Sequence, residues 1–203
     1  SLAPGARGFC YAAAAVTGFT ALALEVLWMR VLHLTFGASV YAFSTLLTAF
    51  LAGLGGGALW LAPRLDRGTR TLGVFAVLQV GIAVVTALLI PVFGQLPTFF
   101  APLYLHFHHG FFSFQFVIFL TALVVMLPAQ LVVRASGRTA LGVGGVYALN
   151  TGGAILGSLA GTFVLIPWLG VRAGMGALAS AAWALGAVGL LAFAPGGRRA
   201  GRL

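Results

Sequence analysis

Glu25 is the residue with the clearest capacity for chemistry, because it is the only acid inside a long apolar segment. A carboxylate at the centre of a bilayer costs roughly 2.5–3.5 kcal/mol on insertion scales, so it needs a partner or a proton. Arg30 follows five residues later, whereas ion pairs on one helix form best at a spacing of three or four residues. Two interpretations stay open: Glu25 binds a cationic ligand, or it is neutralised by Arg30, Arg134 or another group and fixes helix packing.

A second polar set belongs to an internal repeat. Residues 40–45, Val-Tyr-Ala-Phe-Ser-Thr, return at residues 146–151 as Val-Tyr-Ala-Leu-Asn-Thr. If the two copies lie side by side, their polar side chains line one cavity, and Asn150 in particular needs hydrogen-bond partners if it is buried. The candidate ligand-binding residues are Glu25, Arg30, Tyr41, Thr45, Tyr147, Asn150 and Thr151.

Small residues follow each copy of the repeat at four-residue spacing. They are Ala49, Gly53 and Gly57 in the first copy and Gly153, Gly157 and Gly161 in the second. Such ladders let two helix backbones approach closely in a membrane. We therefore predict that Gly53, Gly57, Gly153, Gly157 and Gly161 serve helix packing, with the two ladder-bearing helices crossing each other.

Three histidines, His106, His108 and His109, lie among aromatic residues in the segment 94–111. Pro97 and Pro102 predict a loop there, and the aromatics are typical of a membrane-interface belt or a short surface helix. His33 is the only further nitrogen ligand expected on that side, so we predict no metal site and no cofactor. Neither a catalytic triad nor a zinc-protease motif occurs, and the sequence offers no catalytic residue.

The composition determines which elements must position these residues. Apolar residues make up 61% of the 203-residue chain and charged residues 6%, and the mean hydropathy is +1.10, which excludes an ordinary soluble domain. The net charge of +9 comes from scattered arginines and not from a basic patch, so nucleic acid is not an expected partner. Six segments exceed the roughly 20 residues that cross a bilayer. We predict one all-α transmembrane domain, residues 1–203, with helices at 9–33, 40–62, 71–93, 112–133, 142–166 and 173–194.

Arginine placement predicts the orientation of these helices, because cytoplasmic loops are rich in arginine and lysine. Nine arginines fall on one side of the predicted bundle: Arg7, Arg64, Arg67, Arg70, Arg134, Arg138, Arg198, Arg199 and Arg202. Both termini are then cytoplasmic, in a bacterial-type inner membrane. Each repeat, 9–93 and 112–194, holds three helices, an odd number, so the second copy enters from the opposite face. The prediction is an inverted 3+3 repeat, as in many transporters.

Two sequence blocks carry a resemblance to a known family. Residues 25–55, from Glu-Val-Leu-Trp-Met-Arg through the first repeat copy, and residues 127–170, from Leu-Pro through Pro-Trp-Leu-Gly, are similar to the membrane region of spermidine synthase-like integral membrane proteins. That region is described as major-facilitator-like. The resemblance covers nearly all of residues 9–194. In that family a cytoplasmic Rossmann-like domain transfers an aminopropyl group to a polyamine.

The resemblance implies a transporter-like or substrate-handling membrane module that binds a polyamine or another amine near Glu25. No soluble catalytic domain is expected among residues 1–203, so an enzymatic activity is not assigned to them. Two alternatives remain: a structural subunit of a larger membrane complex, and a membrane anchor for an aminopropyltransferase domain. Major-facilitator-like half-bundles usually work in pairs, so the expected partners are the lipid bilayer, an amine ligand and a second copy or larger complex.

Overall fold

The described part of the chain is almost entirely helical. The structure is a computed structural model that describes residues 4–37, 39–49, 51–52, 71–107, 110, 112–124 and 144–193. The named elements are α1 (Pro4–Phe36), α3 (Thr71–Phe107), α5 (Gly144–Ala160), the π-helix η1 (Gly161–Leu169) and α6 (Gly170–Phe193). Two shorter apolar helices, Val40–Ala49 and Phe112–Val124, lie between them in the sequence.

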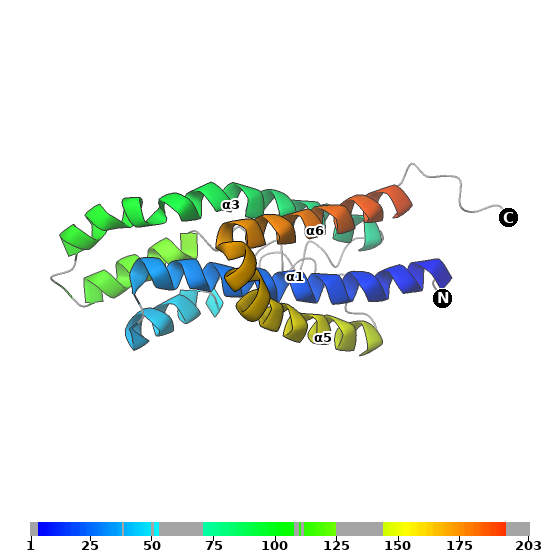
Figure 1. The fold of residues 1–203 in the computed structure, drawn as a ribbon, viewed down its shortest axis with the longest axis horizontal. Helices are drawn as coiled ribbons and strands as arrows, with labels where there is room; N and C mark the ends of the chain where they lie inside the picture. The colour runs from blue at the N-terminus through cyan, green and yellow to red at the C-terminus, as the bar shows by residue number, and fades with distance from the viewer. Residues whose placement is uncertain are drawn as a thin grey trace.

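Three helical runs are long and apolar enough to cross a membrane, which is typical of an integral membrane protein. They are Gly8–Phe36, Phe75–Pro102 and Gly145–Ala192. The third run contains a reversal, because α5 and α6 lie on either side of η1 and run in opposite directions (Figure 1). Three candidate crossings are therefore shown among the described residues, and the predicted total of six crossings stays a prediction.

The turn from α5 to α6 follows from two residues that disturb regular α-helix. Pro167 lies inside η1 and has no backbone N–H to donate. Gly170 follows with φ 73° and ψ 167°, a conformation that favours glycine, and its N–H donates to the carbonyl of Ile166. The sequence prediction of two helices, 142–166 and 173–194, thus corresponds to α5 with most of η1, and to α6.

The connection after α1 is also locally encoded. Gly37 has φ 89° and donates its N–H to the carbonyl of His33 at 3.0 Å, which ends the helix. The Ser39 hydroxyl then accepts a hydrogen bond from the N–H of Ala42 at 3.0 Å, which caps the helix Val40–Ala49. These two residues let the second helix turn back along α1.

The predicted end of the third helix at residue 93 was wrong, because α3 continues to Phe107. Pro91, Pro97 and Pro102 lie inside it. All three prolines are exposed, so their rings point away from the bundle while the helix continues past them. The segment predicted as an interfacial loop is therefore largely helix. His106 is exposed in its last turn, whereas His108 and His109 lie outside the described residues.

The helices form an elongated bundle in which α1, α3 and α5 run in one direction and α6 runs in the other (Figure 1). The two shorter helices also run opposite to α1 (Figure 1). The start of α1 and the end of α6 lie at the same end of the bundle (Figure 1). Helix α1 lies centrally in the bundle, with α5 on one side and the α3–α6 pair on the other (Figure 1).

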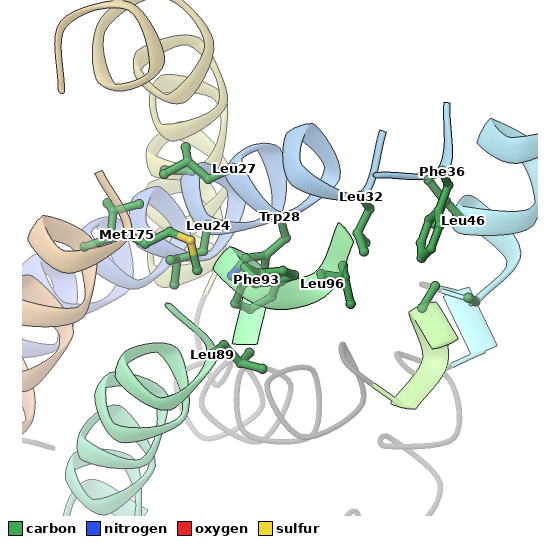
Figure 2. Close-up of a cluster of buried hydrophobic side chains, with 14 of the residues drawn as sticks. Leu24, Leu27, Trp28, Leu32, Phe36, Leu46, Leu89, Phe93, Leu96 and Met175 are labelled. Atoms are coloured by element: carbon green, nitrogen blue, oxygen red, sulfur yellow. The ribbon is translucent and has the colours of Figure 1, made fainter. Parts of the chain in front are cut away.

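The core lies along one face of α1. Leu24, Trp28 and Leu32 repeat at four-residue spacing and are at most 2% exposed. They face side chains of α3 and α6, including Phe93 and Met175 (Figure 2). The remaining surface of α1 is shared between the contact with α5 and the residues that line a cavity.

A small polar cluster lies within this apolar interior. The amide nitrogen of Gln79 donates to the hydroxyl of Thr17 at 2.5 Å, which joins α3 to α1. The Gln79 side-chain oxygen, the Thr86 hydroxyl and the Trp28 indole nitrogen have no hydrogen-bond partner among the described residues. Gln79 was not singled out by the sequence, although a glutamine inside an apolar segment is a readable signal.

Candidate functional site

The candidate site is a cavity of about 610 Å³ between α1, the helix Val40–Ala49 and η1. Its floor is one face of α1, and Phe43 and Leu47 come from the short helix, with Thr162 and Ile166 from η1. The α1 side chains are Glu25, Val26, Met29, Arg30 and His33. They form two adjacent rows at four-residue spacing, 25–29–33 and 26–30, so all five project from the same side of the helix.

The cavity face of α1 follows from the core face. Leu24, Trp28 and Leu32 turn toward α3 and α6, so residues one position later in the sequence are rotated by about 100° away from that core. Glu25 and Met29 are half-buried as a result, and Arg30 is exposed. The apolar pattern of α1 thus places the acidic Glu25 and the basic Arg30 beside the core and not within it.

Two interactions orient side chains in the cavity wall: an aromatic contact and a hydrogen bond from a hydroxyl group. The rings of His33 and Phe43 stack with centroids 5.7 Å apart and planes inclined by 14°. The Thr162 hydroxyl donates to the Ser158 carbonyl at 3.0 Å, which leaves its oxygen able to accept a hydrogen bond from a ligand. Neither His33–Phe43 stacking nor Thr162 was predicted, because both depend on how distant segments meet.

Glu25 and Arg30 lie in this one cavity, as the first interpretation requires, but they do not form an ion pair with each other. Within the described ranges, Glu25 has neither an ion pair nor a hydrogen bond. Arg134, considered from the sequence as a partner, lies outside those ranges. The carboxyl group is therefore available to the cavity.

The other five predicted ligand-binding residues do not line this cavity. Tyr41 is exposed at the start of its helix, and the Thr45 hydroxyl is 2.8 Å from the Tyr41 carbonyl and 3.2 Å from the Gln115 side-chain oxygen. Tyr147, Asn150 and Thr151 lie near the start of α5, toward the opposite end of the bundle (Figure 1). The helix Val40–Ala49 and α5 run in opposite directions (Figure 1), and these five side chains do not meet around the cavity at Glu25.

The glycines of α5 pack against α1 and not against the helix that carries the first ladder. A Cβ added at Gly153 or Gly157 would collide with backbone atoms of Ala15 or Phe19, and one at Gly161 would touch Ala23 at 3.4 Å. Gly18 completes the close approach, because a Cβ there would collide with the Asn150 carbonyl. Gly53 and Gly57 lie outside the described residues, so their packing partner stays a prediction.

No protein-family model, curated protein or solved structure matches this chain. The resemblance to the spermidine synthase-like membrane proteins therefore stays an expectation from the sequence blocks, and the site is interpreted from its own geometry.

The arrangement favours binding over bond-breaking chemistry. In the part of the chain that the structure describes, no three His, Cys, Asp or Glu side chains gather as a metal site would require. Cys10, the single cysteine, is half-buried near the start of α1 and far along the helix from the cavity. The cavity offers one carboxylate, one guanidinium, an imidazole and a hydroxyl on otherwise apolar walls, which is the typical composition of a small-molecule site.

Proposed function

We propose that this chain is a transporter-like or substrate-handling membrane module that binds an amine group at Glu25. The observation that supports the proposal is the cavity itself, in which a half-buried carboxyl has no partner among the described residues. An acid in an apolar helix is costly unless a cation or proton satisfies it. A ligand ammonium would satisfy it, with Thr162 as a neighbouring acceptor.

The proposed architecture is six membrane crossings arranged as an inverted 3+3 repeat. The helix directions support it, because the first three helices run forward, back and forward along the bundle, and the last three run back, forward and back (Figure 1). Both termini would lie in the cytoplasm of a cell with a bacterial-type inner membrane, by the arginine distribution.

Two further roles remain as alternatives. The resemblance implies a spermidine synthase-like family, in which the module would accompany or anchor an aminopropyltransferase domain. A structural role in a larger complex is favoured by the apolar side chains exposed on η1, among them Phe163 and Trp168. A binding cavity that contains two opposite charges is more than either alternative requires, so ligand binding is the function that we place first.

Glu25→Gln tests the proposed function. The amide keeps the shape of the side chain but cannot pair with an ammonium, and a hydrogen bond to a charged group is worth about 1.5–3 kcal/mol. We expect amine affinity to fall by about tenfold or more. The measurement is a titration with spermidine and with ethanolamine, read by calorimetry on purified protein in detergent.

Arg172→Gln is the control, because Arg172 is exposed and lies in a different cavity, beside Pro91 and Met175. Equal amine affinities for wild type and Glu25→Gln, with both proteins folded, would overturn the proposal.

The topology is tested by cysteine labelling on a Cys10→Ser background. Gly8 and Ala192 are exposed at one end of the bundle, and Val40, 78% exposed, lies at the other. With six crossings we expect Gly8→Cys and Ala192→Cys to react with a membrane-impermeant maleimide only after the cytoplasmic face is opened, and Val40→Cys to react in intact cells. Labelling of positions 8 and 192 from opposite faces would exclude an even number of crossings.

A further inference from the structure

The described residues that line the cavity at Glu25 carry two opposite charges. They include Glu25 and Arg30 but no further Asp, Glu, Lys or Arg. The formal charges of the wall therefore cancel when the carboxyl is ionised and His33 is neutral. A ligand that carries only positive charge would be attracted by Glu25 and repelled by Arg30.

The two charges are held apart by their position on the helix. Five residues correspond to about 7.5 Å of axial rise and about 140° of rotation. The position four residues after Glu25, where a helical partner would stand, is Met29, and the position four residues before Arg30 is Val26. Each charged side chain thus has an apolar neighbour on its own row, and the structure contains no Glu25–Arg30 ion pair.

Apart from His33 and Thr162, the other described residues of the wall are apolar. Phe43 and Leu47 come from the short helix and Ile166 from η1, with Val26 and Met29 between the two charges on α1. A ligand that pairs with both charges would also bring a carbon skeleton against these side chains. Burial of that skeleton would exclude water and strengthen both ionic contacts.

We propose that the ligand of this cavity is zwitterionic, with its ammonium group at Glu25 and an anionic group at Arg30. This inference rests on the proposed function, since it keeps the amine at Glu25, and it adds the second charge. It also separates this site from a polyamine site, because the second ammonium of a polyamine would lie next to the Arg30 guanidinium.

Two sources could supply the same zwitterion. One is a free metabolite that carries an ammonium and a carboxylate or phosphate. The other is the headgroup of a zwitterionic phospholipid, whose acyl chains would leave past Phe43 and Leu47, both partly exposed on the bundle surface. The chemistry recognised by the cavity is the same, so the experiment has one arm for each source.

The first arm measures binding of three matched probes to the purified full chain by calorimetry. O-phosphoethanolamine carries both charges, ethanolamine carries only the ammonium and inorganic phosphate only the anion. We expect phosphoethanolamine to bind about tenfold or more tightly than either single-charge probe. Arg30→Gln should reduce its affinity to that of ethanolamine, and Glu25→Gln to that of phosphate. Arg172→Gln should change none of the three.

The second arm measures retained lipid by mass spectrometry after reconstitution into equimolar phosphatidylethanolamine and phosphatidylglycerol and extraction in mild detergent. If the ligand is a lipid headgroup, wild type should retain several-fold more phosphatidylethanolamine than Glu25→Gln or Arg30→Gln. If either arm shows a preference that requires both Glu25 and Arg30, that result supports the inference and identifies the source of the ligand.

Two results would overturn the inference, and they differ in what happens to the proposed function. If ethanolamine or spermidine binds as tightly as phosphoethanolamine, needs Glu25 and is unaffected by Arg30→Gln, the site is an amine site and only the zwitterion is excluded. If neither a free probe nor a lipid depends on Glu25, the proposed function fails as well. Circular dichroism and gel filtration of each variant confirm that it is folded.

Discussion

Replacing Phe100 by alanine should destabilise the protein strongly, although the sequence pattern places this residue in an interfacial loop. Phe100 is 5% exposed and packs edge-on against Phe36 of α1, with ring centroids 4.6 Å apart and planes inclined by 70°. It also contacts Phe114 of the helix Phe112–Val124, at a centroid distance of 6.0 Å. Loss of this ring would open a cavity where three helices meet.

The expected loss of stability follows from the measured effects of removing buried aromatic side chains. Phe→Ala in a core typically lowers the free energy of unfolding by about 3–5 kcal/mol. In a membrane the transfer part of that value shrinks, because the separated helices remain in lipid, while the packing part persists. We therefore expect a loss of about 2 kcal/mol or more for Phe100→Ala.

Phe99→Ala is the matched control, because the neighbouring ring is 63% exposed and exposed sites usually change stability by about 0.5 kcal/mol or less. Denaturation in mixed detergent and SDS micelles, followed by circular dichroism, measures both variants. If the two variants lose equal stability, Phe100 is not a core residue and the extension of α3 beyond residue 93 does not pack as described.

Replacing Gly157 by alanine should weaken the contact between α1 and α5. A Cβ at this position would lie 2.7 Å from the Cα of Phe19 and closer still to its carbonyl oxygen. The obstacle is backbone, which cannot rotate out of the way as a flexible side chain can. Overpacking of this kind typically costs about 1–3 kcal/mol, and we expect Gly157→Ala to fall in that range.

Gly152 supplies the control on the same helix. A Cβ there meets nothing within 4 Å. Gly→Ala in an open helix position should stabilise the chain by about 0.5–1 kcal/mol, because glycine loses more backbone entropy on folding. The two substitutions are therefore expected to change the unfolding free energy in opposite directions in the same micelle assay. A gain for both variants would show that α1 and α5 are further apart than described.

The glycines of α5 show which features of helix packing a local sequence pattern can predict. Four-residue spacing of small side chains identified Gly153, Gly157 and Gly161 as residues suited to close helix contact. The spacing carries no information about the partner, and the contact is made with Ala15, Phe19 and Ala23 of α1. Small residues in α1, above all Gly18, were an available signal for this pairing.

The prolines of α3 show the opposite case, in which a local rule failed. Pro97 and Pro102 predict an interruption, since each removes a backbone donor. The helix continues because buried neighbours such as Leu96 and Phe100 gain packing against α1, and because the proline rings point outward. The packing of α3 against α1 thus outweighed the tendency of proline to interrupt a helix.

The sequence by itself determined that the chain is helical and suited to a membrane, because hydrophobic length is a property of each segment alone. It also determined that Glu25 needs a partner, because the cost of an acid in hydrocarbon does not depend on the fold. Only the tertiary structure decided which groups surround that acid. Glu25 and Arg30 share a cavity with Phe43 and Thr162 because the core face of α1 turns them toward the short helix and η1. Tyr147 and Asn150 do not join them, since they lie near the start of α5, toward the opposite end of the bundle.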